Sequence, residues 1–333
     1  MRRHTLQRLA VAAALALTVA ACGGSEEESS PAPAPASSGS STTSADPRAD
    51  WPEKIVLAAV PAEQDAQLVE SYRVTAEILA AELGIEVEFF QAADYAGVIE
   101  ALIANRVDLA QFGPFSYVLA KARGAEADVV GVMTGGPDEE PGYQSYLFAR
   151  ADNDAVNAIG DIVGKTLCLV DPASTSGYLV PTALMLENGI NPDEDLNILV
   201  AGGHDTSVLE TAAGTCDAGF AFDDMVDSIL IDAGQIEEGE LKIVQKSFVI
   251  AGSPMAMRTG LPQSLQDEIR AIINERVNVD WAVDNGYCAS SDDCSLSDEE
   301  IWGYVQRDDS FYDGIRTLCT QVGDRVSSCD GIG

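Results

Sequence analysis

The sequence predicts an α/β protein of two lobes, each built on a mostly parallel sheet with helices on both faces. From residue 54 onward, short apolar runs alternate with amphipathic stretches of helical period, as in parallel sheets covered by crossover helices. This alternation fails at 142–149 and at 241–257, where extended runs follow one another without a helix between them. Two such crossings indicate two lobes joined by a hinge. The expected first lobe covers 51–146 and 250–333, and the expected second lobe covers 147–249.

Seven apolar runs have the length expected of strands, and six stretches between them have the period of amphipathic helices. The expected strands cover 55–60, 85–90, 108–112, 128–133, 166–170, 196–200 and 218–222. The expected helices cover 64–83, 94–104, 114–123, 174–188, 206–213 and 223–233. Two more helical stretches, at 262–285 and 297–318, are expected to pack across the back of the first lobe.

The N-terminal segment predicts export. Three arginines precede an apolar run at 9–21 that is too short to cross a membrane and is typical of a secretory signal. The run ends in Val-Ala-Ala-Cys at 19–22, which resembles the bacterial lipoprotein box. That resemblance implies a signal peptide at 1–22 and a lipidated Cys22, which would hold the protein at the cell membrane, facing the periplasm or the cell exterior. A plain signal peptide cut elsewhere is the alternative. Residues 23–50 are almost free of large apolar side chains, so we expect a disordered tether there.

The charge of the chain is strongly acidic. The formal net charge is −35, and removing the first 22 residues, with three arginines and no acids, changes it to −35 − 3 = −38. Only five lysines occur in the whole chain, so nucleic acid, which requires clustered cations, is excluded as a partner. Such a surface favours solubility and suits a salty or alkaline habitat.

Six cysteines follow Cys22, and an even number in an exported chain indicates disulfides. The close spacing of Cys288 with Cys294, and of Cys319 with Cys329, favours two short C-terminal loops. That pairing leaves Cys168 to meet Cys216. Zinc is the alternative, but the chain has only two histidines and no Cys-x-x-Cys, so neither a metal nor a cofactor is expected.

Several turns stand where a ligand of an open sheet would bind. Ligands of such sheets lie at the carboxyl ends of the strands, where helix N-termini present unpaired N–H groups. The turns in this position are 93–98, 112–117, 171–178, 202–207 and 222–224. In the third turn, Ser174, Thr175 and Ser176 place three hydroxyls at one helix start, which is a donor-rich cradle for a tetrahedral oxyanion. A redundant N-cap is the alternative. Gly177 lacks a Cβ and so allows a ligand or another backbone to come close.

Four segments resemble the phosphate/phosphite/phosphonate substrate-binding proteins of ABC importers. They are Asp-Tyr-Ala-Gly-Val-Ile-Glu-Ala-Leu at 94–102, Phe-Gly-Pro-Phe-Ser-Tyr-Val-Leu-Ala at 112–120, Asp-Pro-Ala-Ser-Thr-Ser-Gly at 171–177 and Gly-Gly-His-Asp at 202–205. They occur in the family's order, and the resemblance covers about residues 54–258. It implies a two-lobe periplasmic-binding-protein-like fold of type II that closes on a small phosphorus oxyanion and delivers it to a membrane permease. It implies no catalytic residue and no cofactor, and we expect a monomer.

The resemblance also implies the residues that line the pocket. They are Tyr95, Ser174, Thr175, Ser176, His204 and Asp223, with Tyr117 as a further donor. The hydroxyls at 174–176 would donate short, charge-assisted hydrogen bonds to the phosphoryl oxygens. The tyrosines would donate from the opposite lobe, so that the anion holds the lobes closed, and a protonated His204 would add charge. Buried core tyrosines and a structural histidine are the alternatives.

Asp223 bears on the choice of anion. A carboxylate repels an anion unless a proton lies between them. Phosphate, phosphite and phosphonate monoanions carry an acidic O–H, whereas sulfate at neutral pH does not. We therefore expect Asp223 to reject sulfate, unless it serves only as an N-cap of the next helix.

One departure from the family pattern favours the smaller ligands. Relatives often carry two prolines on the return crossing, followed by an acidic residue, whereas the segment 247–254 lacks both prolines and has Ser253 where the acid is expected. Aminoalkylphosphonates need extra carboxylates for their ammonium group. Phosphite, phosphate and methylphosphonate are therefore favoured.

Two other functions compete with import. One is an exported hydrolase of phosphate esters, which would need a nucleophile with a base or a metal cluster, and only His204 could serve as a histidine base. The other is a binding protein that feeds a membrane sensor, which would use the same pocket.

Overall fold

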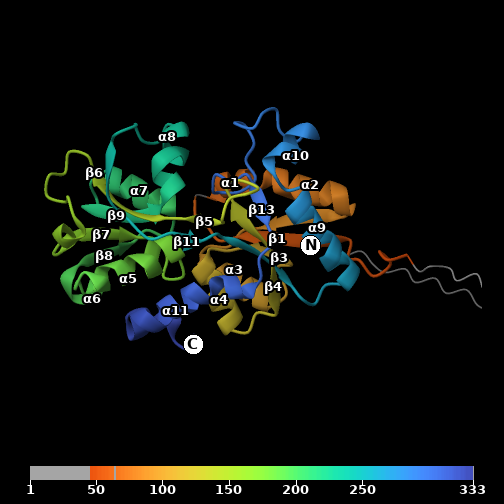
Figure 1. Cartoon of the computed structure of the whole chain (residues 1–333), viewed down its shortest axis with the longest axis horizontal. Coiled ribbons are helices and arrows are strands. Elements are labelled where there is room, and N and C mark those ends of the chain that lie inside the picture. Colours follow the sequence, from red (N-terminus) through yellow and green to blue (C-terminus); the bar gives the residue numbers. More distant parts are fainter. Residues whose placement is uncertain (1–45, 64, 333) are drawn as a thin grey trace, which may run out of the picture. The chain divides into compact units, whose positions relative to one another are not determined.

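The computed structural model describes residues 46–63 and 65–332, in which two mixed sheets carry two lobes (Figure 1). The first sheet has the order β13-β4-β12-β3-β1-β2. Its strands are β1 (Lys54–Ala59), β2 (Glu86–Phe90), β3 (Leu109–Gln111), β4 (Ala127–Thr134), β12 (Pro254–Arg258) and β13 (Gly303–Val305). The second sheet has the order β10-β6-β9-β7-β8. Its strands are β6 (Ser145–Arg150), β7 (Thr166–Leu169), β8 (Asn197–Val200), β9 (Ala218–Phe222) and β10 (Leu241–Lys246).

The chain crosses between the sheets at a short antiparallel pair, β5 (Gly142–Tyr143) and β11 (Ile250–Ala251). Both lie between the two lobes in Figure 1. The pair falls within a few residues of the two crossings expected from the sequence, and it joins Tyr143 to Ile250 and Gly142 to Ala251. Two strands that cross side by side form a hinge.

The seven expected strands are confirmed, but the expectation of mostly parallel sheets is wrong. In the first sheet β1 pairs parallel with β2 and β3, whereas β12 and β13 enter antiparallel. In the second sheet β7 pairs parallel with β8 and β9, whereas β6 and β10 enter antiparallel. The reason is the hinge, because a chain that leaves a lobe and returns need not keep the direction set by crossover helices.

Helices cover these sheets largely where the sequence predicts them. The α-helices are α1 (Asp65–Ser71), α2 (Arg73–Leu83), α3 (Tyr95–Ile103), α4 (Pro114–Ala122), α5 (Val180–Glu187), α6 (Pro192–Asp195), α7 (His204–Ala212), α8 (Leu230–Asp232), α9 (Gln263–Glu275), α10 (Val279–Asp284) and α11 (Asp313–Val322). Two π-helical turns, η2 (Thr175–Leu179) and η3 (Met225–Ile229), precede α5 and α8. The 3-10 turns are η1 (Ile159–Ile162), η4 (Asp309–Tyr312), η5 (Gly323–Arg325) and η6 (Ser327–Cys329). No helix in this part of the chain is long and apolar enough to span a bilayer.

The C-terminal segment differs from the prediction. A helix was expected over 297–318, but β13 joins the edge of the first sheet beside β4, and the helix begins only at Asp313. That helix, α11, contacts both α4 of the first lobe and α5 of the second. It therefore bridges the lobes instead of covering the back of the first.

The three expected disulfides are confirmed. Cys168 of β7 bonds to Cys216 in the loop before β9. Cys288 and Cys294 close a loop after α10, and Cys319 ties α11 to Cys329. The last two each close a short loop within the C-terminal segment.

The N-terminal predictions lie mostly outside the described residues. These are the signal peptide at 1–22, its Cys22, and the tether as far as residue 45. The end of the expected tether, 46–50, is ordered on the first lobe, where the Pro47 carbonyl accepts from Ser264 Oγ at 2.7 Å. The predicted disordered tether, 23–50, is therefore too long at its C-terminal end.

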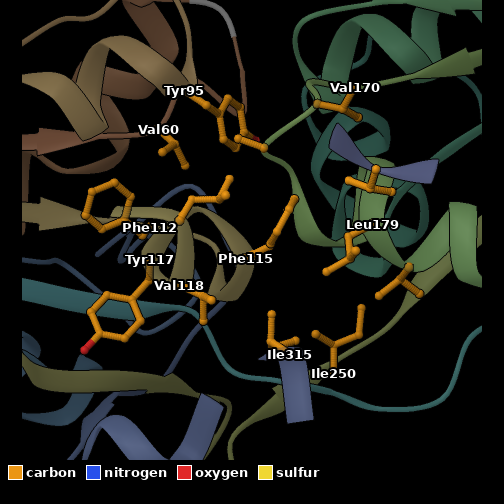
Figure 2. Packing of buried hydrophobic residues seen from close by; sticks show 14 of the residues in the cluster. Val60, Tyr95, Phe112, Phe115, Tyr117, Val118, Val170, Leu179, Ile250 and Ile315 are labelled. Atoms are coloured by element: carbon orange, nitrogen blue, oxygen red, sulfur yellow. The ribbon is translucent and has the colours of Figure 1, made fainter. Parts of the chain in front are cut away.

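A continuous apolar cluster runs beneath the contact between the lobes. It joins Phe112 and Phe115 of the first lobe to Val170 and Leu179 of the second, and Figure 2 shows Phe115 between Phe112 and Leu179. This cluster supports the turns at which the helices begin.

Candidate functional site

An enclosed cavity lies where four helices begin. It is lined by residues of both lobes and of the C-terminal segment: Val60, Ala62, Tyr95, Gln111, Phe112, Gly113, Tyr143, Ser174, Thr175, Ser176, His204, Phe222, Ser253, Asp298 and Glu299. The N-terminal residues of α3, η2 and α7 are among them, and Gly113 directly precedes α4. The first turn of a helix leaves N–H groups without helical partners and carries the positive end of the dipole. The cavity is therefore electropositive on these sides without any Lys or Arg in its lining.

The run Ser174-Thr175-Ser176 is buried at this cavity and is hydrogen-bonded to groups on both sides of it. Ser174 Oγ accepts from the Gly177 amide at 3.1 Å and lies 3.2 Å from His204 Nε2. Thr175 Oγ1 accepts from the Phe115 amide across the cleft at 2.8 Å. A hydroxyl has one proton to donate and two lone pairs. The Gly177 amide and His204 Nε2–H occupy both lone pairs of Ser174 Oγ, so its O–H group is left to donate on the side of Tyr95. The Thr175 and Ser176 side chains are hydrogen-bonded to Tyr143.

Gly177 allows the close approach that the sequence suggested, but the approaching group is the side chain of Val170 in the same lobe. A Cβ at this position would lie 2.3 Å from Val170 Cγ2 and 2.9 Å from Ser174 Oγ. The Val170 amide also donates to the Gly177 carbonyl at 3.0 Å. Gly177 thus sets how tightly η2 packs on the end of β7.

His204 is a neutral donor. Its Nδ1 accepts from the Phe222 amide at 3.3 Å, so the ring proton is on Nε2, which faces Ser174. Burial lowers the pKa of His204 to about 3. The expected option of a protonated, charged His204 is therefore wrong in this environment, because no carboxylate compensates the loss of water.

Two tyrosines face the cavity, but only one of them was predicted. Tyr95, the first residue of α3, is 2 % exposed, and burial raises its pKa. Tyr143 of the hinge strand β5 is the other. Burial raises the pKa of Tyr143 as well, while side-chain hydrogen bonds from Ser176 and Thr175 oppose the rise. Both hydroxyls are neutral donors beside the serine–threonine run.

Tyr117 is not at the cavity. Its hydroxyl donates to Asp309 Oδ1 at 2.7 Å, and its ring packs against Tyr312 at 5.1 Å between centroids. Figure 2 shows its oxygen pointing away from Tyr95. The expectation failed because Tyr117 lies a full turn into α4, where a side chain faces the packed C-terminal segment and not the helix N-terminus.

Asp223 lies beside the cavity and not in its wall. It lines an adjoining depression with Glu139, Glu140, Asp224 and Glu299. Its Oδ2 accepts from the Gln144 amide at 2.9 Å, and within the described residues its buried Oδ1 has no hydrogen-bond partner. Burial raises its pKa. The structure thus separates Asp223 from the other expected site residues.

Asp298 and Glu299 are site residues that sequence reasoning missed. Both line the cavity, from the segment that was expected to be a helix on the back of the first lobe. Asp298 accepts from the buried Tyr72 hydroxyl, and Glu299 Oε1 accepts from Ser253 Oγ at 2.5 Å. The acid that seemed lost at Ser253 is therefore supplied by Glu299. The cavity therefore has a carboxylate beside Ser253 although position 253 itself carries no acid.

Further carboxylates surround the cavity mouth with raised pKa values. Burial, reinforced by Asp298, raises the pKa of Glu63 to about 7, and burial beside Asp223 raises that of Asp224 to about 7. Burial also raises the pKa of Asp298, to about 6, and that of Glu299. The site consequently combines neutral donors with carboxylates that hold protons more tightly than usual. Within the described part of the chain, no cluster of three or more His, Cys, Asp or Glu side chains has the arrangement of a metal site.

The two lobes are closed on this cavity. The His204 amide donates to the Ala62 carbonyl at 2.7 Å, and the Glu300 amide donates to Asp224 Oδ2 at 3.3 Å. The closed cavity has a volume of about 20 Å³ for the centre of a water-sized sphere. One water needs about 10–15 Å³ by this measure. The cavity thus suits a compact anion of a few heavy atoms.

Known proteins match both the sequence and the fold. Residues 57–275 match the family model described as ABC transporter, phosphonate, periplasmic substrate-binding protein. The phosphate-import protein PhnD of Mycolicibacterium smegmatis is 45% identical over 280 residues, which are 82% of this chain and 87% of that protein. The phosphonates-binding periplasmic protein of Escherichia coli is 33% identical over 191 residues, 56% of this chain and 55% of that one.

A solved structure shares the fold at low identity. PhnD1 of Prochlorococcus marinus in complex with methylphosphonate superposes with a TM-score of 0.70 at 14% identity, covering 83% of this chain and 99% of that one. The match supports the two-lobe fold alone. Together with the family model, which spans more than half of the sequence, these comparisons show that the chain belongs to the family of phosphonate ABC-transporter periplasmic substrate-binding proteins.

Proposed function

We propose that the protein captures a small phosphorus oxyanion, such as phosphite, phosphate or methylphosphonate, and delivers it to the permease of an ABC importer. The supporting observation is the closed, cation-free cavity lined by the hydroxyls of Ser174, Thr175 and Tyr95, with His204 Nε2–H donating to Ser174. Neutral donors and helix N-termini hold an anion without an ion pair, which suits a ligand that must later be released. A lipid anchor at Cys22, a signal peptide at 1–22 and a monomeric state belong to the same proposal.

Residues of the two lobes would have different roles. The N–H and O–H groups of Ser174, Thr175 and Ser176 would bind the phosphoryl oxygens from the second lobe, and His204 would orient the Ser174 hydroxyl by donating its Nε2–H to it. Tyr95 would donate from the first lobe and Tyr143 from the hinge. A ligand held from both lobes stabilises the closed state, because it binds that state better than the open one.

The Ser174–His204 pair argues against the hydrolase. A histidine base needs an unprotonated nitrogen facing the nucleophile, and in a triad its other nitrogen donates to an acceptor. Here Nδ1 accepts from the Phe222 amide, so the nitrogen facing Ser174 carries the proton and cannot receive one. We expect no turnover of phosphate esters with or without divalent metal, and measurable turnover would contradict the proposal.

A thermal-shift and calorimetric screen tests the ligand class. Phosphate, phosphite, methylphosphonate, aminoethylphosphonate and sulfate are compared, because a ligand that binds only the folded protein raises its stability with affinity and concentration. We expect stabilisation by at least one of the first three ligands. If none of them raises Tm, the proposed ligand class is wrong.

A matched pair of variants tests the site itself. Tyr95→Phe removes a hydroxyl at the cavity, whereas Tyr117→Phe removes a hydroxyl that is bound to Asp309 away from the cavity. A hydrogen bond to a charged group contributes about 1.5–3 kcal/mol, so Tyr95→Phe should weaken binding by about tenfold or more. Tyr117→Phe should leave Kd unchanged. Equal effects of the two variants would place the ligand elsewhere.

A further inference from the structure

The C-terminal segment forms a fixed third wall of the cavity. Thr75 Oγ1 of α2 donates to the Leu296 carbonyl at 2.7 Å, and Tyr72 donates to Asp298. Ser297 Oγ donates to the Glu299 carbonyl at 2.9 Å and accepts from the Glu299 amide at 3.1 Å. Leu296, Ser297 and Asp298 are buried. The backbone that carries Glu299 is therefore held firmly against the first lobe.

The Glu299 side chain is also held in one position. Ser253 is 2 % exposed and donates to Oε1, while no hydrogen bond reaches Oε2 from the residues that the structure describes. Glu299 lines both the cavity and the adjoining depression that holds Asp223. It thus offers an oriented carboxylate to a space whose other polar groups are mainly donors.

The two sides of the cavity have complementary hydrogen-bonding capacity. The side made by the hydroxyls of Ser174 and Thr175 and by the helix N-termini donates, and an ionised carboxylate can only accept. A tetrahedral oxyanion with one acidic O–H matches both sides, since its bare oxygens accept and its O–H donates. An anion without that proton would place oxygen against oxygen at Glu299, which is repulsive.

We propose that Glu299, carried to the cleft by the C-terminal segment and oriented by Ser253, accepts the acidic O–H of the bound oxyanion and so excludes fully deprotonated anions. The inference rests on the proposed function and deepens it, because it names the ligand class as oxyanions that keep one proton at neutral pH. It also moves the role expected of Asp223 to a residue that lines the cavity. Ser253 acts as a positioning residue.

The carboxylates around Glu299 oppose its ionisation, and the hydrogen bond from Ser253 favours it. Asp298 adjoins it on the same segment, and Asp224 and Asp223 face it from the second lobe. Their negative charge, after burial itself, raises the pKa of Glu299. Glu139, Glu140 and Glu300 stand around the depression that Glu299 also lines. The other titratable neighbours are tyrosines that stay neutral (Tyr72, Tyr143, Tyr304 and Tyr312) and the neutral His204.

Calorimetry with phosphite, phosphate and sulfate at neutral pH tests the proposal on the full-length wild type and Glu299→Gln. The amide keeps an acceptor for Ser253 and adds an N–H for a bare anion oxygen. We expect the wild type to prefer phosphite or phosphate over sulfate, and Glu299→Gln to reduce that ratio by about tenfold or more. Glu300→Gln, a neighbouring exposed acid that does not line the cavity, is the matched control and should keep the ratio.

The pH dependence of sulfate binding gives a second readout. Sulfate itself does not titrate near neutrality, so its binding to the wild type requires a proton on Glu299. At pH values above the pKa of Glu299, the affinity for sulfate should rise by up to about tenfold for each unit of falling pH, and Glu299→Gln should remove this dependence. Ser253→Ala keeps the Glu299 carboxylate but removes the hydroxyl that orients it. This variant should therefore reduce the discrimination against sulfate less than Glu299→Gln does.

The outcomes separate this inference from the proposed function. Phosphite or phosphate binding by the wild type with the same sulfate ratio in Glu299→Gln would overturn the role of Glu299 alone. The same holds if sulfate binds the wild type as well as phosphite does. If no phosphorus oxyanion binds the wild type, the proposed function fails and this inference fails with it.

Discussion

Replacing Gly177 by alanine tests whether the close packing of η2 on β7 holds the binding groups in place. The added Cβ would lie 2.3 Å from Val170 Cγ2, 2.4 Å from Val170 Cβ and 2.9 Å from Ser174 Oγ. Carbon atoms in contact normally lie about 3.5–4.0 Å apart. The turn must therefore move away from β7 by roughly 1 Å, and the Val170–Gly177 hydrogen bond of 3.0 Å must lengthen.

The expected cost of Gly177→Ala follows from these contacts. Overpacking of this kind costs about 1–3 kcal/mol, and the weakened hydrogen bond adds about 1 kcal/mol. The lower entropy of the unfolded alanine chain returns about 0.5 kcal/mol. The net destabilisation is about 1.5–3.5 kcal/mol. At about 2.1 cal/mol/K of unfolding entropy per residue, this corresponds to a fall in Tm of roughly 3–6 °C for a domain of this size.

Thermal unfolding with and without phosphite measures both consequences. Since Ser174 lies against the new methyl group, Gly177→Ala should also weaken phosphite binding. Gly160→Ala is the control, because a Cβ there meets nothing within 4 Å. Adding Val170→Ala to Gly177→Ala should restore stability only in part, because it removes Val170 Cγ2 but leaves Cβ at 2.4 Å from the new methyl group. A Gly177→Ala variant as stable as Gly160→Ala, with unchanged affinity, would refute the reasoning.

Two more predictions concern stability. Burial raises the pKa of Glu63 from 4.5 in the unfolded chain to about 7 in the folded protein. The stability that this group contributes is therefore fully present below about pH 4.5 and is lost as pH rises through about 7. The wild type should lose on the order of 1 kcal/mol more than Glu63→Gln between about pH 6 and 8 in urea unfolding, and parallel profiles would contradict this. For the disulfides, loop-closure entropy predicts a cost of about 4 kcal/mol for removing Cys168–Cys216, which spans 48 residues. Removing Cys288–Cys294, which spans 6, should cost only about 2 kcal/mol, and the reverse order in urea unfolding of paired serine variants would count against this.

The parts of the site that depend on local signals could be predicted from the sequence. Ser174, Thr175, Ser176, His204 and Tyr95 all lie where a helix begins after a strand, and hydroxyls and glycines mark such starts in the sequence itself. The structure brings these five residues together at one cavity. Their closeness follows from the fold, because the ends of neighbouring strands and the facing lobe converge there.

The parts that depend on distant contacts could not be predicted. Glu299 reaches the cavity through a bond to Ser253, 46 residues earlier, and a strand as short as β13 leaves no periodic pattern to detect. The prediction that Tyr117 lines the pocket failed for a related reason. Its partners Asp309 and Tyr312 lie on the same C-terminal segment, whose position was not predicted correctly. The one signal in the sequence was Ser253 itself. The absence of the expected acid at this position indicates that another residue nearby in space supplies the carboxylate.

The bridging position of α11 limits how far this protein can open. The helix touches α4 in one lobe and α5 in the other, and its disulfide from Cys319 to Cys329 fixes the chain that follows it. Rotation about the β5–β11 hinge must slide α11 along at least one of these helices and expose apolar surface, including Ile315 and Leu318. The cleft of the free protein should therefore open only slightly. The opening should admit a small ligand, but it should not separate the outer surfaces of the two lobes widely. A permease that recognises the closed pair of lobes would then distinguish loaded from unloaded protein by small shifts in contact geometry, and not by gross shape.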